Sequence, residues 1–161
     1  MTHWSKQPNR QESGGEQRAA LEALVETVIG AAYEVSNVLG AGFIEKVYER
    51  ALLEELRLRN VSVATQASYS VIYKGKHVGV YTADLVVADR LLIEVKCVDR
   101  FTTEHLAQCI NYLKASGLKL ALLINFRHPK NRVASHRSPP VIRVYSRVFA
   151  ASGISLCYLH A

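Results

Sequence analysis

Apolar residues recur every three or four positions near the start of the chain, which is the spacing of one face of a helix. Ser13 and Glu16 have the spacing of a capping box, so this helix is expected to begin near residue 13. A Gly-Ala-Gly sequence at residues 40–42 ends it, and a second helix is expected over residues 43–59, with Asn60 as its stop. The apolar stripe of the first helix consists of Leu21, Leu24, Val25, Val28, Ala32, Val35 and Leu39.

After residue 60 the pattern changes to short apolar runs separated by turn residues, which is typical of β-strands. The turn signals Lys74-Gly75-Lys76 and Ala88-Asp89-Arg90 divide this stretch into three consecutive strands, so a meander is expected. The three strands are expected over residues 67–73, 77–87 and 91–98.

The remaining pattern predicts one more helix and two more strands. Thr102 or Thr103 is expected to cap the helix, and Gly117 to end it. Residues 119–125 are expected to form a buried strand, and residues 141–149 a last strand between a basic loop and a ragged tail. A strand–helix–strand step in this order favours an α/β fold, in which helices pack on a mixed sheet.

The length of 161 residues suits one domain with its own core. Residues 1–15 are expected to form a disordered leader, which leaves residues 16–161 as a single domain. No apolar run reaches the length of a membrane span, and the N-terminus lacks the apolar core of a signal peptide. With three cysteines and no CxxC motif, a reducing, cytoplasmic location is expected.

Charge is distributed unevenly along the chain, whose formal net charge is +6. Glu104 is the last acidic residue, and lysines and arginines continue to the C-terminal part. Such asymmetry indicates an anionic partner such as nucleic acid. A solvated basic surface without a ligand is the competing interpretation.

The turn at residue 89 predicts which residues face each other across the second and third strands. Pairing across it brings Leu85 opposite Ile93. It then brings Asp84 opposite Glu94, with Cβ atoms about 5 Å apart. Side-chain alternation places Lys96 on the same face as Glu94. Two acids and a lysine are therefore expected together in an otherwise apolar segment.

Charged groups in such a segment are costly unless they are paired or serve a function. Two carboxylates suit a hard divalent cation, Mg²⁺ or Mn²⁺, and such a cation can activate a water and neutralise a phosphodiester. Lys96 can orient or deprotonate that water. The competing interpretation is a cross-strand salt bridge in which Lys96 neutralises Asp84 and Glu94.

Two helices add candidate residues to this group. His105, Gln108 and Tyr112 share one helix face, from which an amide and a hydroxyl can reach a phosphate or a water. Glu45 follows the glycine-rich break at the start of the second helix, where a carboxylate is also favourable for electrostatic reasons alone.

The run GAGFIEKVY at residues 40–48 is similar to the signature of the bacterial GxxExxY protein family. That family is part of the PD-(D/E)XK nuclease superfamily. The chain resembles it over roughly residues 20–127, although Ser36 and Arg127 depart from the expected pattern. The further matching segments lie at residues 33–35, 37–56, 73–75, 83–86, 93–96, 108–114 and 122–126.

This resemblance implies a restriction-endonuclease-like core, α-β-β-β-α-β, with an additional N-terminal helix. It implies Lys96 as the catalytic lysine, together with Gln108 and Tyr112 from a Q-x-x-x-Y motif beside the active centre. The metal ligands that it implies are Glu45, Asp84, Glu94 and the backbone carbonyl of Val95.

The expected function is therefore metal-dependent hydrolysis of nucleic acid, with DNA as the expected substrate. A nuclease-fold module that binds nucleic acid or a protein partner with little or no catalysis is the alternative. A homodimer is a further expectation, since many enzymes with this fold cut duplexes as dimers. The residues expected to contact the phosphate backbone are Lys114, Arg127, Lys130 and Arg132.

Overall fold

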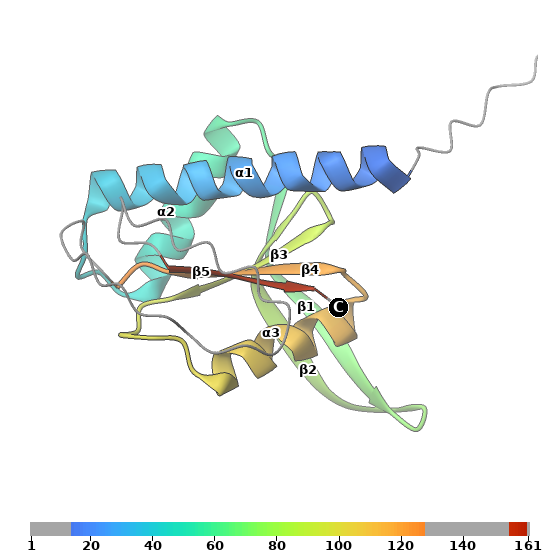
Figure 1. Ribbon diagram of the computed structural model, residues 1–161. Coiled ribbons are helices and arrows are strands. Elements are labelled where there is room, and N and C mark those ends of the chain that lie inside the picture. Colours follow the sequence, from blue (N-terminus) through green and yellow to red (C-terminus); the bar gives the residue numbers. More distant parts are fainter. Residues whose placement is uncertain (1–13, 128–154, 161) are drawn as a thin grey trace, which may run out of the picture.

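The computed structural model describes residues 14–127 and 155–160 (Figure 1). Within these residues, the order of elements confirms the expected α-β-β-β-α-β core with an additional N-terminal helix. The elements are α1 (Gly14–Leu39), α2 (Glu45–Leu58), β1 (Val63–Tyr73), β2 (Lys76–Val87), β3 (Leu91–Lys96), α3 (Thr103–Ser116), β4 (Leu120–Asn125) and β5 (Ser155–His160).

The ends of several helices and strands differ from the sequence expectation. Helix α1 includes the last two residues of the expected leader, and residues 1–13 lie outside the described part. Helix α2 begins two residues later than expected, and Asn60 follows its end with a φ of 57°. Strand β1 begins four residues earlier than expected, because Val63 to Thr65 still pair with the end of β2. Glycine-like backbone at Asn60 is consistent with its expected role as a stop.

The C-terminal expectation is partly wrong. A strand, β5, occupies part of the stretch that was expected to be a ragged tail, and it pairs antiparallel with β4. The strand expected over residues 141–149 lies outside the described residues. Residues 155–160 alternate apolar and polar only weakly, which is why the sequence did not predict β5.

Within the described residues the strands form a five-stranded sheet in the order β1-β2-β3-β4-β5. Strands β1, β2 and β3 form the expected antiparallel meander, and β4 pairs parallel with β3 after the crossover through α3. Leu85 pairs with Ile93, which confirms that part of the predicted register.

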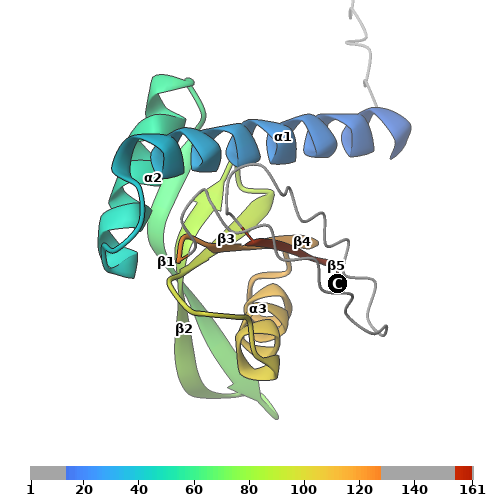
Figure 2. The same cartoon turned by 60° about the vertical axis from the view of Figure 1, so that its left-hand side comes forward.

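Helices cover both faces of the sheet (Figures 1 and 2). Helices α1 and α2 pack on one face, where the apolar stripe of α1 meets Leu52 and Leu56 of α2 and Leu85, Ile93 and Ile124 of the sheet. Helix α3 packs on the other face, where Cys109, Tyr112 and Leu113 meet Val86, Leu92 and Leu123. Because β3 and β4 are covered on both faces, they are fully apolar except at the end where the charged residues lie.

The pairing of β1 with β2 is interrupted at Gln66 and Asp84. Thr65 pairs with Leu85, and Ala67 pairs with Ala83, but the residues between them are unpaired and Gln66 has a φ of 53°. Leu85 packs on the α1–α2 face, whereas Ala83 packs on the α3 face. Side-chain alternation therefore shifts at this irregularity, which changes the direction of the Asp84 side chain.

Candidate active site

The Asp84 carboxylate binds the backbone of β3. Its Oδ2 accepts a hydrogen bond of 2.9 Å from the N–H of Val95. The predicted pairing of Asp84 with Glu94 is not part of the strand ladder, which ends at Leu85 and Ile93. Burial, and to a smaller degree the nearby Glu49, raises the pKa of Asp84, although the hydrogen bond from Val95 opposes this shift. The carboxylate is thus fixed at the edge of β3, beside the other charged groups.

Glu94 is a buried carboxylate, only 3% exposed. Its Oε1 accepts hydrogen bonds from Lys96 Nζ at 2.7 Å and from Gln108 Nε2 at 2.8 Å. Its Oε2 is buried and has no hydrogen-bond partner among the described residues. Burial, and then the charge of Asp84, raises the pKa of Glu94 to about 7. One oxygen of this carboxylate therefore lacks the hydrogen-bond partner that buried polar groups normally have.

Lys96 pairs with Glu94 rather than spanning both acids. Its side chain is 13% exposed and forms a salt bridge of 2.7 Å with Glu94 Oε1. Burial acts to lower the pKa of Lys96, but the hydrogen bond to Glu94 and the neighbouring carboxylates raise it overall. The ammonium group therefore stays charged at neutral pH, yet it leaves Glu94 Oε2 without a partner. The expected salt bridge thus forms, but it satisfies only part of the acidic group.

Helix α3 contributes two of its predicted residues to the group. Gln108 Nε2 lies between the Glu94 carboxylate and Tyr112 Oη, to which it also donates at 3.0 Å. The Tyr112 hydroxyl donates to the carbonyl of Thr82 at 2.9 Å. His105, one turn earlier, instead accepts from the N–H of Thr102 at the helix start. The spacing of four residues thus places an amide and a phenol side by side, linking Glu94 to β2.

The Glu45 carboxylate binds the backbone directly after β3. Its Oε1 accepts a hydrogen bond of 2.9 Å from the N–H of Cys97, next to Lys96. Among the described residues, no three His, Cys, Asp or Glu side chains lie close enough together to hold a metal ion. The structure therefore brings Asp84 and Glu94 together as a pair and leaves Glu45 on the adjoining backbone.

Tyr48 connects the glycine-rich loop to helix α2. Its hydroxyl donates to the carbonyl of Gly40 at 2.7 Å and accepts from the N–H of Phe43 at 3.4 Å. Its ring stacks on Phe126 with centroids 4.7 Å apart and planes 4° apart. Glu45 and Tyr48 therefore have different roles on the same helix. Tyr48 binds the glycine-rich loop, and Glu45 binds the backbone directly after β3.

We expect Tyr48→Phe to lower the free energy of unfolding by about 1 kcal/mol, since it removes the hydroxyl bonds but keeps the ring. Urea unfolding of the purified variant measures this change. Tyr69→Phe is a suitable control, because Tyr69 lies outside this loop on β1. An unchanged unfolding midpoint in Tyr48→Phe would show that the loop is held by apolar contacts alone.

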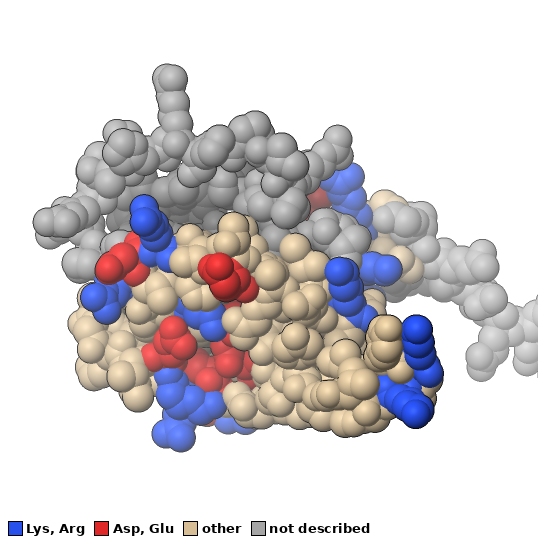
Figure 3. All heavy atoms as spheres, turned by 90° about the horizontal axis from the view of Figure 1, so that it is seen from below, with Lys and Arg blue, Asp and Glu red and all other residues tan. Residues whose placement is uncertain are grey.

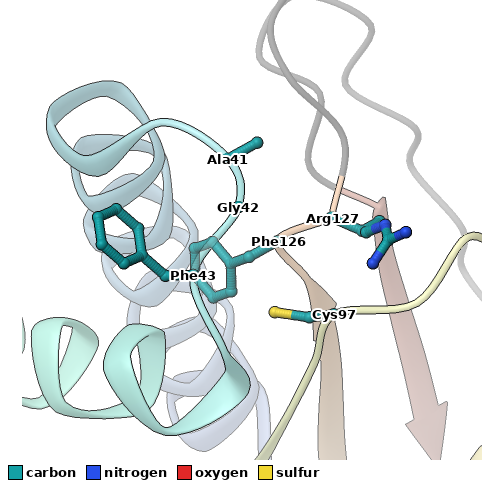
Figure 4. Close-up of a pocket in the computed structure, with 6 residues that line it drawn as sticks. All are labelled: Ala41, Gly42, Phe43, Cys97, Phe126 and Arg127. Carbon is teal, nitrogen blue, oxygen red and sulfur yellow. The ribbon is translucent and has the colours of Figure 1, made fainter.

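A cavity of about 370 Å³ lies between the glycine-rich loop and the ends of β3 and β4. Figure 4 shows the Cys97 side chain directed toward the ring of Phe126, with Arg127 beside them. Burial and the nearby Glu45 raise the pKa of the Cys97 thiol, so it stays protonated at neutral pH. Asp84 and Glu94 do not line this cavity. The cavity therefore lies next to the pair of acids, Asp84 and Glu94, but does not include them.

A family model described as the PD-(D/E)XK nuclease superfamily matches residues 22–138. The chain belongs to the PD-(D/E)XK nuclease superfamily. No curated protein matches the chain. Among solved structures, it is similar to the one titled "Crystal structure of SSO0001", with 21% identity and a TM-score of 0.38. That match covers 68% of this chain and 55% of the other, so the chain spans little more than half the length of that protein.

A member of this superfamily is expected to bind nucleic acid through basic side chains. Four such residues were predicted from the sequence, and the structure describes two of them. Lys114 is exposed in the last turn of α3. Arg127 is exposed and lies 3.3 Å from Asp99. Lys130 and Arg132 lie outside the described residues. Figure 3 shows acidic side chains gathered at one side of the face seen from below, bordered by lysines and arginines.

Three residues that lie near the candidate site were not predicted from the sequence. They are Lys46, Glu49 and Gln66. Glu49 is 7% exposed and accepts hydrogen bonds from Lys46 at 2.7 Å and from Gln66 at 3.1 Å. The position of Glu49 one turn after Glu45 was a signal for a shared helix face. No signal in the sequence indicated Gln66, because its approach depends on the interrupted pairing of β1 and β2.

No helix in residues 14–127 is both long enough and apolar enough to cross a bilayer.

Proposed function

We propose that this protein is a nuclease of the GxxExxY branch that hydrolyses phosphodiester bonds with the aid of Mg²⁺ or Mn²⁺. Membership of the superfamily supports a nuclease, and one observation carries the metal requirement. Glu94 Oε2 is buried beside Asp84 and has no hydrogen-bond partner among the described residues. Lys96 compensates only Oε1 of Glu94, so a second carboxylate beside Oε2 is unfavourable unless a further cation binds there.

The donor atoms of this group fit a hard divalent cation. Carboxylate and carbonyl oxygens are the protein ligands that Mg²⁺ and Mn²⁺ prefer. We propose that Asp84, Glu94 and the Val95 carbonyl hold the metal directly. Bound there, it would neutralise charge on the phosphodiester and make a water more acidic. The Val95 carbonyl suits this role, because its N–H on the same side of β3 already binds Asp84.

We propose an outer role for Glu45. Its Oε1 holds the N–H of Cys97 at 2.9 Å, which leaves Oε2 for the metal or for a water bound to the metal. Contact with a hydrated metal, together with support of the β3 backbone next to Lys96, preserves that hydrogen bond. Glu45 would then belong to the site without forming a three-carboxylate group with Asp84 and Glu94.

Lys96 is proposed to act on the attacking water. Its ammonium group lies 2.7 Å from Glu94 Oε1, so it is placed at the carboxylate that the metal would share. From there it can hold a water or stabilise negative charge on a phosphate oxygen. Gln108 fixes the same oxygen of Glu94, and Tyr112 fixes Gln108. These two residues are therefore proposed to hold the carboxylate in place and to lie next to the substrate.

The substrate is proposed to be DNA, bound through its phosphates. Lys114 and Arg127 are exposed, and with Lys130 and Arg132 they are proposed to contact the backbone. Two copies, each cutting one strand, would complete the cleavage of a duplex, so we propose a homodimer as the active form on such substrates.

A binding module without catalysis is the alternative function. The absence of a three-carboxylate group among the described residues favours it, since two acids hold a metal less tightly than three. The salt bridge between Lys96 and Glu94 also occupies the proposed catalytic amine. The two functions differ in turnover and in metal binding.

The deciding experiment is a cleavage assay with labelled single-stranded, double-stranded and branched DNA and with RNA of the same sequences. We expect cleavage with Mg²⁺ or Mn²⁺ and none after chelation with EDTA. Calorimetric titration of the protein with Mn²⁺ alone separates the two functions further. Metal binding that Asp84→Asn abolishes supports the nuclease, whereas nucleic-acid binding without metal binding or cleavage supports the binding module.

A further inference from the structure

The hairpin of β1 and β2 projects beyond the helices that cover the rest of the sheet (Figures 1 and 2). Its outer part runs from about residue 70 to residue 80, with the turn at Lys74 and Gly75. Pairing continues to the tip, where Tyr73 faces Lys76, so the arm is an ordered two-stranded ribbon. A two-stranded ribbon has the dimensions that fit a nucleic-acid groove.

The tip of this arm exposes large apolar side chains. Ile72, Tyr73 and Val78 are 58%, 62% and 58% exposed, and Val80 is 56% exposed. A group of such residues on a projecting element indicates a contact surface rather than an ordinary solvated turn.

The same tip is basic. Lys74 and Lys76 are exposed on either side of Gly75, and Lys74 Nζ lies 5.4 Å from the centre of the Tyr73 ring. The sequence has no acidic residue between Glu55 and Asp84. The arm therefore offers positive charge and a planar aromatic ring together, with no acidic side chain of its own to repel an anion.

We propose that the hairpin tip, defined as residues 72–78, is a second nucleic-acid contact that binds the duplex flanking the cleavage site. This proposal rests on the proposed function and deepens it, because it identifies a duplex as the substrate. Lys74 and Lys76 bind phosphates, and Tyr73 packs against the sugar or base edges in the groove.

The length of the arm sets the position of this contact. Eight residues separate Asp84 from Lys76, and at about 3.4 Å per residue they span roughly 27 Å. A duplex rises about 3.4 Å per base pair, so an arm that lies along the duplex axis reaches phosphates about eight base pairs from the scissile bond. Figure 3 shows lysines and arginines both around the acidic side chains and at the opposite side of the face seen from below.

A second copy of the chain is the other partner that an exposed apolar tip could bind. A two-fold interface places the same patch of each subunit against the other. The lysines at positions 74 and 76 of both copies would then lie in one interface, and like charges at close range oppose such a contact. Nucleic acid is favoured because it supplies the negative charge that the arm itself lacks.

The first test measures binding of a labelled 30-base-pair DNA duplex by fluorescence anisotropy, in the Lys96→Ala background with Mg²⁺ so that the duplex is not consumed. We expect the double change Lys74→Ala and Lys76→Ala to lower the slope of log Kd against log salt by about 1.8, which corresponds to two phosphates. The matched control is Arg18→Ala with Lys119→Ala, which removes two exposed charges elsewhere. The change Lys74→Arg with Lys76→Arg keeps the charge and should keep the slope.

The second test varies the length of duplex on each side of the cleavage site. We expect binding to the wild-type arm to weaken when the flank is shorter than about eight base pairs, following the reach of the arm. The variant that lacks Lys74 and Lys76 should bind long and short flanks equally. Circular dichroism spectra that match those of the unchanged chain exclude unfolding as the cause.

Two results would overturn the proposal. One is an unchanged affinity, salt slope and flank dependence in the double alanine variant. The other is loss of self-association on light scattering with DNA binding intact, which would assign the tip to a second copy. If the unchanged chain binds the duplex through this arm but cleaves nothing, the proposed nuclease activity fails and the contact stands. If it cleaves and the arm variants behave like the control, the contact alone fails.

Discussion

We expect Lys96→Ala to reduce metal-dependent cleavage about 10³-fold, within the range that removal of a proton-transfer or charge-stabilising group produces. The variant loses the only ammonium group that contacts Glu94 among the described residues, at 2.7 Å in the unchanged protein. The effect should appear in kcat, because the lysine acts on the water and the developing charge rather than on the bound duplex. Single-turnover cleavage at saturating protein measures this step directly.

Lys119→Ala is the matched control, since it removes an exposed lysine just before β4. We expect it to cleave at the rate of the unchanged protein. Lys96→Ala should retain its fold, because β3 keeps its pairing with β2 and β4 on both sides. If the folded Lys96→Ala protein cleaves at a rate within a factor of about three of the control, Lys96 has no role in catalysis.

The second large effect is a loss of stability of the metal-free protein as the pH rises from about 4.5 to about 7. Glu94 keeps its proton up to about pH 7 in the folded protein, against an ordinary value of 4.5, because of burial and the charge of Asp84. Between these values the folded state binds more protons than the unfolded state, so the free energy of unfolding falls as the pH rises. The whole shift corresponds to roughly 3 kcal/mol. Asp84, whose pKa is also raised, acts in the same direction.

Urea unfolding at a series of pH values with EDTA measures this dependence. We expect Glu94→Gln to flatten it between about pH 4.5 and 7, while Glu26→Gln, a change at an exposed glutamate of α1, leaves it intact. Mg²⁺ at about 100 times its Kd should restore about 2.7 kcal/mol to the unchanged protein at pH 8. If Mg²⁺ raises the free energy of unfolding of Glu94→Gln by the same amount, the metal binds elsewhere.

Much of the fold followed from periodicity. The steps of three and four in α1 describe a stripe that is buried against α2 and the sheet, because a helix turns every 3.6 residues. The turn at residues 88–90 set the register of Leu85 and Ile93, because alternation in a hairpin leaves no other pairing once the turn is known. The ends of strands were less predictable. Strand β1 begins four residues earlier than expected because these residues pair with β2. That pairing joins residues that are far apart in the sequence.

The candidate site was predictable in part. Glu94 and Lys96 come together as alternation predicted, and Gln108 reaches Glu94 within hydrogen-bonding distance, next to the site as the family resemblance implied. The direction of Asp84 was not predictable, because the positive φ of Gln66 interrupts the ladder and shifts the alternation of β2. The approach of Glu49 to this region likewise depends on how α2 lies against the sheet.

The sequence by itself determined the order of elements, the faces of the helices and the strand that carries Glu94 and Lys96. These are local properties, since a period of 2 or 3.6 residues is set by the backbone alone. Only the tertiary structure decided that Asp84 binds the N–H of Val95, that Glu45 binds that of Cys97, and that one oxygen of Glu94 stays without a partner. Those contacts join residues that are far apart in the chain or lie beside an irregular strand, where packing and not periodicity sets the distance between two atoms.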